Sequence, residues 1–184
     1  MLEFIIIGMV LDEPLTGYDI KKFIENGIGV FYKASYGTLY PSLKKLTEKG
    51  CLTMFEESKS GRQKKYYQIT EKGKKAFFEW LSSPVDLNDN TDNRLVKVYF
   101  FDRLPPDIRN RQLQEYELKN LNYLRKLQAL EKHFSQIEQK DCFYYKLSTL
   151  YYGICIVQDN IKWCRHIRDK KPLKELIITE TEVE

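Results

Sequence analysis

Apolar and polar positions along residues 1–50 predict three short helices. Residues 2–11 are almost all apolar, which is typical of a helix packed on most of its sides, and Pro14 ends this run. Residues 17–26 follow the spacing of an amphipathic helix capped by Thr16, with an apolar stripe of Tyr18, Ile20, Phe23 and Ile24. The third helix is expected over 36–49, ended by Gly50, with a core face made of Leu39, Leu43 and Leu46.

Two short runs of strand-like composition, 51–57 and 65–70, come next and flank a basic loop that contains Gly61. These runs predict a two-stranded β-hairpin. A fourth helix is expected over 71–81, with Thr70 as its cap and an apolar stripe of Ala76, Phe77, Trp80 and Leu81. Three helices followed by a hairpin are the arrangement of a winged helix-turn-helix, so residues 1–82 are predicted to form such a domain.

The second half of the chain has a different pattern. Residues 83–93 are rich in turn-forming and acidic residues and are expected to form a linker, after which helices are expected at 94–104, 107–140 and 141–169. The last helix carries a heptad seam formed by Phe143, Leu147, Leu150, Ile154, Val157 and Ile161. Because such a seam needs a partner, we predict a helical dimerisation domain over 94–176, followed by an acidic tail at 177–184. The predicted fold class is therefore mainly α with a small β-hairpin.

The composition argues against a disordered chain and against a membrane protein, since 42% of the 184 residues are hydrophobic and 30% are charged. The apolar run at 2–11 is shorter than the ~20 residues that a bilayer span needs, and it lacks the basic start and cleavage site of a signal peptide. We therefore expect a soluble, cytoplasmic protein without a membrane partner.

The four cysteines and two histidines show no spacing typical of a metal site, so neither a metal nor a cofactor is expected. Cys142, Cys155 and Cys164 lie in apolar helical sequence and are expected to be small buried side chains. His133 and His166 are expected at the surface. Since the sequence contains no recognisable catalytic motif, we do not expect an enzyme.

The net charge of +4 is unevenly distributed. Residues 58–75 contain one acid, Glu71, and seven basic residues: Lys59, Arg62, Lys64, Lys65, Lys72, Lys74 and Lys75. A run of lysines alone is as consistent with a solvated surface as with a binding site. Its position on a hairpin directly after the third helix favours DNA binding, because cations on a wing neutralise phosphates and release counterions.

Three stretches of the sequence resemble the PadR family of bacterial transcriptional regulators. They are LTGYD at 15–19, FYKASYGTLYPSLKKLTEKG at 31–50 and GRQKKYYQITEKG at 61–73. The resemblance covers residues 1–82 densely, whereas the second half is similar in pattern and length to a subgroup with an extended C-terminal dimerisation domain. The resemblance implies a homodimeric winged-helix repressor. We predict that it binds a palindromic operator in double-stranded DNA, with half-site centres about one helical turn apart.

The family pattern implies DNA contacts at the start of the third helix and on the hairpin. The candidate DNA-binding residues are Ser35, Tyr36, Gly37, Thr38, Tyr40, Pro41, Lys44, Lys45, Lys59, Arg62, Lys64 and Lys65. Two roles are open for Tyr40, a contact with the DNA backbone or packing in the core. Pro41, at about the sixth position of the expected helix, predicts a slight bend.

Aromatic residues make up 14% of the chain, so they must fill a core, a ligand pocket or a contact surface. Phe4, Phe23, Phe77 and Trp80 are assigned to the winged-helix core. Tyr144, Tyr151 and Trp163 lie near the last seam and are candidates for binding a small aromatic effector, such as a phenolic acid, that releases the repressor from DNA. The alternative is that these rings form part of the dimer core.

The alternative function is a winged-helix protein-interaction or adaptor module without DNA specificity. Ionic strength distinguishes the two functions, because DNA binding predicts a steep loss of affinity with added salt, whereas an apolar protein interface does not.

Overall fold

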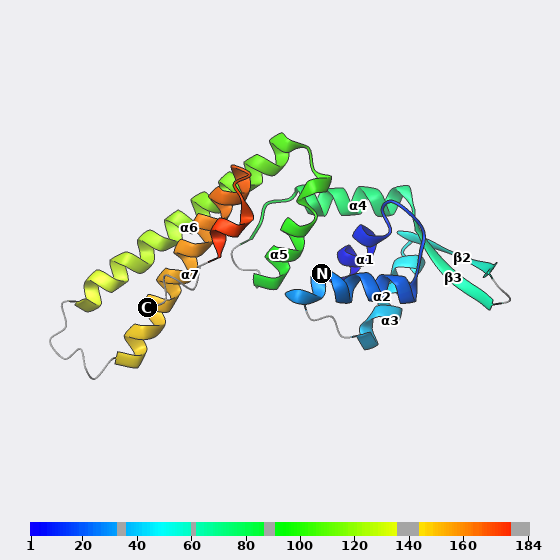
Figure 1. The fold of residues 1–184 in the computed structure, drawn as a ribbon, viewed down its shortest axis with the longest axis horizontal. Helices are drawn as coiled ribbons and strands as arrows, with labels where there is room; N and C mark the ends of the chain where they lie inside the picture. Colours follow the sequence, from blue (N-terminus) through cyan, green and yellow to red (C-terminus); the bar gives the residue numbers. More distant parts are fainter. Residues whose placement is uncertain (33–35, 60–61, 87–90, 136–143, 178–184) are drawn as a thin grey trace. The chain divides into compact units, whose positions relative to one another are not determined.

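The computed structural model describes residues 1–32, 36–59, 62–86, 91–135 and 144–177 (Figure 1). The chain divides into two compact units. The first unit comprises residues 1–83 and 88–105, and the second comprises residues 84–87 and 106–184.

Three helices open the first unit, as the sequence predicts. They are α1 (Leu2–Met9), α2 (Gly17–Asn26) and α3 (Leu39–Glu48). The 3-10 turn η1 (Ile28–Val30) follows α2, and a second turn, η2 (Tyr36–Thr38), leads into α3. The predicted third helix therefore begins as a 3-10 turn and becomes α-helical only at Leu39. The predicted core face of α3 is confirmed, since Leu39, Leu43 and Leu46 are all buried.

Side-chain caps fix the start of two helices. The Thr16 hydroxyl accepts a hydrogen bond from the Asp19 amide at 3.2 Å and donates one to the Asp19 carboxylate at 2.6 Å, so the two residues form a capping box at the start of α2. The helix α4 (Glu71–Ser82) begins in a similar way at Thr70, whose hydroxyl accepts from the Gly73 amide at 3.1 Å. These caps satisfy amide donors that a helix start leaves unpaired, and both were predicted from the sequence.

A three-stranded antiparallel sheet with the order β1-β3-β2 lies beside these helices. The strands β2 (Leu52–Lys59) and β3 (Arg62–Ile69) form the predicted hairpin, which projects from the helices of its unit in Figure 1. The two-residue strand β1 (Leu15–Thr16) pairs with Tyr66 and Tyr67 on β3 and was not predicted. The hairpin strands are longer than predicted, because the ladder continues to the Lys59–Arg62 pair through residues assigned to a loop.

The helix α5 (Thr91–Tyr99) and the turn η3 (Phe101–Arg103) pack within the first unit. The Phe100 ring lies edge-to-face on Phe77 at 5.4 Å between centroids, and the Lys97 ammonium donates to the Ser83 hydroxyl at 2.9 Å. Arg103 donates two hydrogen bonds to the Asp12 carboxylate. Through these contacts the compact unit extends to residue 105, whereas the sequence pattern places the start of the helical domain at residue 94.

The core of the first unit is formed by branched aliphatic side chains and by an aromatic cluster. Phe77 is fully buried, and Phe4 stacks on Trp80 at 4.5 Å between ring centroids. The assignment of Phe23 to the core is wrong, since Phe23 is 50% exposed. Tyr18 is exposed as well, because Ile20 and Ile24 alone fill the inward face of α2.

The second unit is built on two long helices, α6 (Pro106–Ser135) and α7 (Tyr144–Arg168), which run side by side in Figure 1 and are followed by the turn η5 (Leu173–Leu176). Side chains of both helices are buried between them, among them Leu113, Tyr116, Val157, Ile161 and Cys164. None of the helices in the described part of the chain combines the length and the apolar character that crossing a membrane requires.

A buried glutamate ties the two long helices together, and a buried asparagine is satisfied within its own helix. Glu117 on α6 accepts hydrogen bonds from Arg165 at 2.6 Å and from Arg168, both on α7. Burial raises the pKa of Glu117, but the two guanidinium groups lower it by more, so the pKa lies below the ordinary value of a glutamate. Asn120, the polar position within the apolar pattern of α6, is buried and donates to the Tyr116 carbonyl oxygen at 2.8 Å.

Two sequence expectations about the second unit are wrong. Cys155 is exposed, whereas Cys164 is buried as predicted, and Cys142 lies outside the described residues. His166 is buried, and its Nε2 lies 2.8 Å from the carbonyl oxygen of Pro172, which follows α7 in the chain. His133 is exposed, as expected.

The start of α4 lies very close to the backbone at Cys51, and this contact leads to a prediction about the free energy of unfolding. A Cβ atom added at Gly73 would lie 2.2 Å from the Cys51 carbonyl oxygen, so Gly73→Ala is expected to lower the free energy of unfolding by about 1–3 kcal/mol. Gly153→Ala in α7 is the matched control, since its nearest neighbour would be Leu127 at 3.9 Å. Alanine favours a helix over glycine by about 0.5–1 kcal/mol, so the control should be stabilised. Urea denaturation followed by circular dichroism measures both variants, and a Gly73→Ala variant as stable as the unmodified protein would contradict the close approach.

Candidate nucleic-acid interface

The helix α3 presents one face to the core and another to solvent. Its three buried leucines recur at spacings of four and three residues, which turns the intervening positions outward. Tyr40 is 60% exposed, and Pro41 and Lys44 are exposed beside it. The exposure of Tyr40 excludes the core-packing role and leaves its ring accessible for contact.

The start of α3 explains why Pro41 is tolerated. Thr38 is the N-cap residue, so Pro41 is the third residue of the helix and lies in its first turn, where a backbone N–H would have no helical acceptor. The sequence predicted a bend at Pro41 because it placed the start of the helix at residue 36. With the α-helix starting at Leu39, there is no reason to expect that bend. Gly37 and Thr38 are exposed in η2; Ser35 lies outside the described residues, and only the backbone of Tyr36 is described.

The hairpin brings basic and acidic side chains together. Lys64 and Lys65 are exposed on β3, and the backbone of Lys59 pairs with that of Arg62 at the far end of the ladder. Opposite the two lysines stand Glu57 and Glu56, and the Lys65 ammonium lies 3.7 Å from the Glu56 carboxylate. The charge count over residues 58–75 did not include Glu56 and Glu57. The hairpin is therefore less basic than that count indicates. Exposed ion pairs of this kind are weak, which leaves the lysines able to exchange their partner for a phosphate.

A groove of about 560 Å³ lies where the start of α2, the exposed face of α3 and β3 meet. The Tyr40 ring closes over Gly17, where an added Cβ would lie 2.9 Å from a ring carbon. The groove is lined by Thr16, Gly17, Tyr18, Asp19, Tyr40, Lys64, Lys65 and Tyr67. It thus joins predicted candidates from α3 and the hairpin on one surface.

Two tyrosines of this groove, Tyr18 and Tyr67, were missed as candidates. Tyr18 is 67% exposed in the first turn of α2, directly after the Thr16 cap. Burial, together with the nearby Tyr40, raises the pKa of Tyr67, so its hydroxyl stays protonated and is a hydrogen-bond donor. The capping box of Thr16 and Asp19 could have identified Tyr18, because it fixes this residue in the first turn of α2. The spacing of Tyr18 from Ile20 and Ile24 led instead to its assignment to the apolar stripe.

Lys45 differs from Lys44 in its partners. The Lys45 ammonium lies 2.7 Å from one oxygen of Glu3, and the Lys49 ammonium lies 2.9 Å from the other. The hydrogen bond from Lys45 is the main cause that lowers the pKa of Glu3, so the carboxylate stays ionised and holds both lysines against α1. The Lys44 ammonium lies 3.8 Å from its helical neighbour Glu48, and its side chain is 80% exposed against 58% for Lys45. Of these two candidates, Lys44 is therefore the one with its charge available.

The candidate dimer residues on α7 lie along the side that faces α6. Val157 and Ile161 are buried within the unit, whereas Leu147, Leu150 and Ile154 are half-buried. Phe143 lies outside the described residues. A different set of apolar side chains on α7 is left exposed, namely Tyr144, Tyr145, Tyr151, Tyr152 and Ile156.

The three candidate effector residues differ in their surroundings. Tyr144 is exposed, Tyr151 donates a hydrogen bond to Glu131 at 2.9 Å, and Trp163 is half-buried. A cavity of about 660 Å³ in the second unit, lined by Leu121, Ile161, Arg165 and His166 among others, includes none of the three.

Two family models match the chain. The model of the "Transcriptional regulator PadR-like family" matches residues 6–79, and the model "Virulence activator alpha C-term" matches residues 92–170. The first match begins within α1 and covers α2, α3, the hairpin and most of α4, and the second begins within α5.

Among characterised proteins, the chain is similar to the negative transcriptional regulator PadR of Bacillus subtilis (strain 168). The two are 32% identical over an alignment of 126 residues that covers 65% of this chain and 69% of the relative. Among solved structures, it is similar to Bacillus subtilis PadR in complex with operator DNA, at 25% identity and a TM-score of 0.46, over 92% of this chain and 96% of that one. A second similar structure is Bacillus subtilis PadR in complex with p-coumaric acid, at 24% identity and a TM-score of 0.42, over 92% and 97% of the two chains.

Proposed function

Because the chain belongs to the PadR family of transcriptional regulators, we propose that it binds a specific duplex DNA operator through the exposed face of α3, the tyrosine-lined groove beside it and the hairpin. The observation that carries the proposal is the groove itself, in which Tyr18, Tyr40 and Lys64 from three separate elements meet on one accessible surface. In a winged helix, these elements are the ones that enter the major groove and reach the flanking backbone.

Each part of this surface has chemistry suited to DNA. Exposed ammonium groups neutralise phosphates, and tyrosine hydroxyls donate hydrogen bonds to phosphate oxygens. In this proposal the side chains of Thr38, Tyr40 and Pro41, at and just before the start of α3, meet base edges and sugars, and Gly37 lets the backbone approach the DNA closely. In this proposal Lys44, Lys64 and Lys65 contact the phosphate backbone of the DNA and so position the protein on it. Lys45 stays in its ion pair with Glu3.

We further propose that the protein acts as a homodimer. The exposed residues Tyr145, Tyr152 and Ile156 recur at spacings of seven and four, so they form one stripe along α7. A stripe of large rings in water is costly and is typical of an interface. In this proposal the stripe covers the same surface of a second copy and Tyr144 and Tyr151 border that interface, whereas Leu147, Leu150 and Ile154 lie on the side of α7 that faces α6.

A dimer related by a two-fold axis would present two recognition helices to a palindromic operator, with half-site centres about one helical turn apart. We propose repression by competition with RNA polymerase, as fits the similarity to a negative regulator. Release from the operator by a small effector completes the proposed cycle.

Loss of an available ammonium group should weaken DNA binding without regard to sequence. Lys44→Gln and Lys64→Gln are each expected to reduce affinity for every duplex and to lower the slope of log affinity against log salt by about 1, because one phosphate contact is lost. Lys126→Gln on α6 removes the same charge from the second unit and is the control. Fluorescence anisotropy with an operator selected from random duplexes measures these values. Binding that is insensitive to salt would instead support a protein-interaction module.

Loss of the Glu3 carboxylate should have the opposite effect. Glu3→Gln frees Lys45 and Lys49 from their shared counter-ion, so affinity for any duplex is expected to rise and the salt slope to steepen by up to about 1. Glu79→Gln on α4 removes an exposed acid of the same unit and serves as the control. An unchanged salt slope for Glu3→Gln would show that these lysines take no part even when they are free.

Dimerisation should depend on the exposed ring stripe. Tyr152→Glu is expected to weaken the dimer by about tenfold or more, since it places a charge where a 69% exposed ring would be covered. Gln128→Glu on α6 adds a negative charge without removing a ring and is the control. Sedimentation equilibrium over a range of concentrations measures both, and a Tyr152→Glu dimer as tight as that of the control would contradict this interface.

A further inference from the structure

The helix α2 begins with a glycine, Gly17, although the backbone conformation there does not require one. Gly17 follows the Thr16 cap as the first residue of the helix and has a negative φ, in contrast to Gly50, whose φ is +70°. Alanine favours a helix over glycine, because glycine loses more backbone freedom on folding. The reason for a glycine at this position therefore lies in the side chains around it.

A side chain on residue 17 would collide with the Tyr40 ring of α3. A Cβ atom added at Gly17 would lie 2.9 Å from Cε1 of Tyr40 and 3.4 Å from its Cζ. Carbon atoms that are not bonded to each other pack best at about 3.5–4.0 Å, so one of the two groups would have to move. The next neighbour, Cδ1 of Leu43, would be 3.5 Å away, which is an ordinary contact. The conflict thus concerns the Tyr40 ring.

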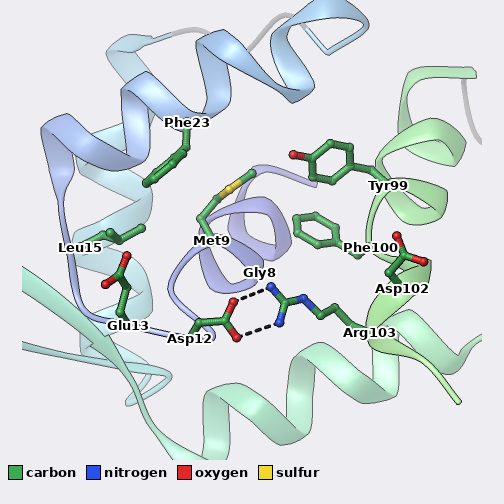
Figure 2. Close-up of a pocket in the computed structure, with 10 residues that line it drawn as sticks. All are labelled: Gly8, Met9, Asp12, Glu13, Leu15, Phe23, Tyr99, Phe100, Asp102 and Arg103. Carbon is green, nitrogen blue, oxygen red and sulfur yellow. Dashed lines mark hydrogen bonds and ion pairs between the residues drawn. The ribbon is translucent and has the colours of Figure 1, made fainter.

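Contacts on both sides of β1 hold the start of α2 in place. Thr16 caps the helix and pairs with Tyr66 in the sheet. Just ahead of β1, Asp12 accepts two hydrogen bonds from Arg103, at 2.7 and 2.5 Å (Figure 2). The Tyr40 side chain, by contrast, is mostly exposed. A Cβ atom on residue 17 would therefore displace the ring rather than the helix.

With glycine in place, the Tyr40 ring lies in the groove where α2, α3 and β3 meet. Tyr67 of β3 is a neighbour of this ring, since the nearby Tyr40 adds to the effect of burial in raising the pKa of Tyr67. Lys64 and Lys65 line the same groove. A displaced ring would change the shape of this surface and leave its charge unaltered, because the lysines keep their places.

We propose that Gly17 is a positioning residue of the DNA surface and acts through Tyr40. Because it has no side chain, Gly17 lets the Tyr40 ring pack against the start of α2, in the position from which the ring contacts the operator. Contacts to bases carry sequence preference, whereas ammonium groups bind the phosphates of any duplex. Gly17 therefore contributes to the choice of operator and not to the salt dependence of binding. This role rests on the proposed function, whereas the placement of the ring does not.

NMR spectra of the full chain with isotope-labelled tyrosine rings, recorded without DNA, test the placement of the ring. Gly17→Ala is expected to shift the Tyr40 ring resonances, which Tyr40→Leu identifies by their loss, while the Tyr152 ring in the second unit is unaffected. Unchanged Tyr40 resonances in a variant that circular dichroism shows to be folded would overturn the proposal.

A second measurement covers the case in which Gly17→Ala does not fold. Tyr40→Leu in the otherwise unmodified chain is expected to shift the α-proton resonances of Gly17, because it removes the aromatic ring that lies beside them. Unchanged Gly17 resonances would overturn the proposal as well.

A double-mutant cycle on DNA affinity, measured by anisotropy, tests the positioning role. Gly17→Ala is expected to weaken binding of the selected operator by about tenfold and binding of a scrambled duplex by much less. The slope of log affinity against log salt should stay the same, since no ammonium group is removed. In the Tyr40→Leu background, Gly17→Ala should change operator affinity by less than about twofold, because the ring atoms that the Cβ would meet are gone.

Gly153→Ala in α7 is the matched control, because its Cβ would lie 3.9 Å from the nearest side chain, and it should bind the operator as the unmodified protein does. A loss of operator affinity that is equal in both backgrounds would show that Gly17 acts without Tyr40 and would overturn the proposal. A displaced ring with full operator affinity would do the same. A chain whose Tyr40 ring moves as expected but that selects no duplex would contradict the proposed function alone.

Discussion

The burial of one face of α3 determines which residues of this helix lie on the surface of the first unit. Leu39, Leu43 and Leu46 are almost completely removed from water, and truncating such a side chain to alanine typically costs about 2–5 kcal/mol. A helix of ten residues is marginal on its own in water, so α3 depends on this packing for its existence as well as its direction. Because the three leucines must point inward, Tyr40, Pro41 and Lys44 must point outward. The surface proposed for DNA is thus a consequence of how the core is filled.

Features set by neighbouring residues could be predicted from the sequence. The bounds of α2, the caps at Thr16 and Thr70, and the leucine face of α3 all follow from spacings of three and four residues. Features set by distant residues could not. The strand β1 has only two residues and exists because Tyr66 and Tyr67 pair with it, and Phe23 is exposed because two isoleucines already fill the inward face of its helix. Part of the tyrosine-lined groove was missed for the same reason, since three elements far apart in sequence form it.

Charge shows the same difference between sequence and structure. Counting basic residues along the chain marks the hairpin correctly as a candidate but treats every lysine as equal. In the fold, Glu3 from α1 holds Lys45 and Lys49, and Glu56 and Glu57 stand opposite two lysines of β3. The charge available for a phosphate depends on how tightly each lysine is already paired, so the exposed Lys44 and the ion-paired Lys45 are unequal neighbours.

The most direct test of the proposed DNA surface is a map of backbone amide chemical shifts, recorded by NMR on the full chain as duplex operator is added. If the outward face of α3 and the groove bind DNA, the largest shifts should fall at Tyr18, at residues 37–44 and at residues 64–67, while amides of the second unit change little. Shifts concentrated on the helices of the second unit, with α3 unaffected, would contradict the account.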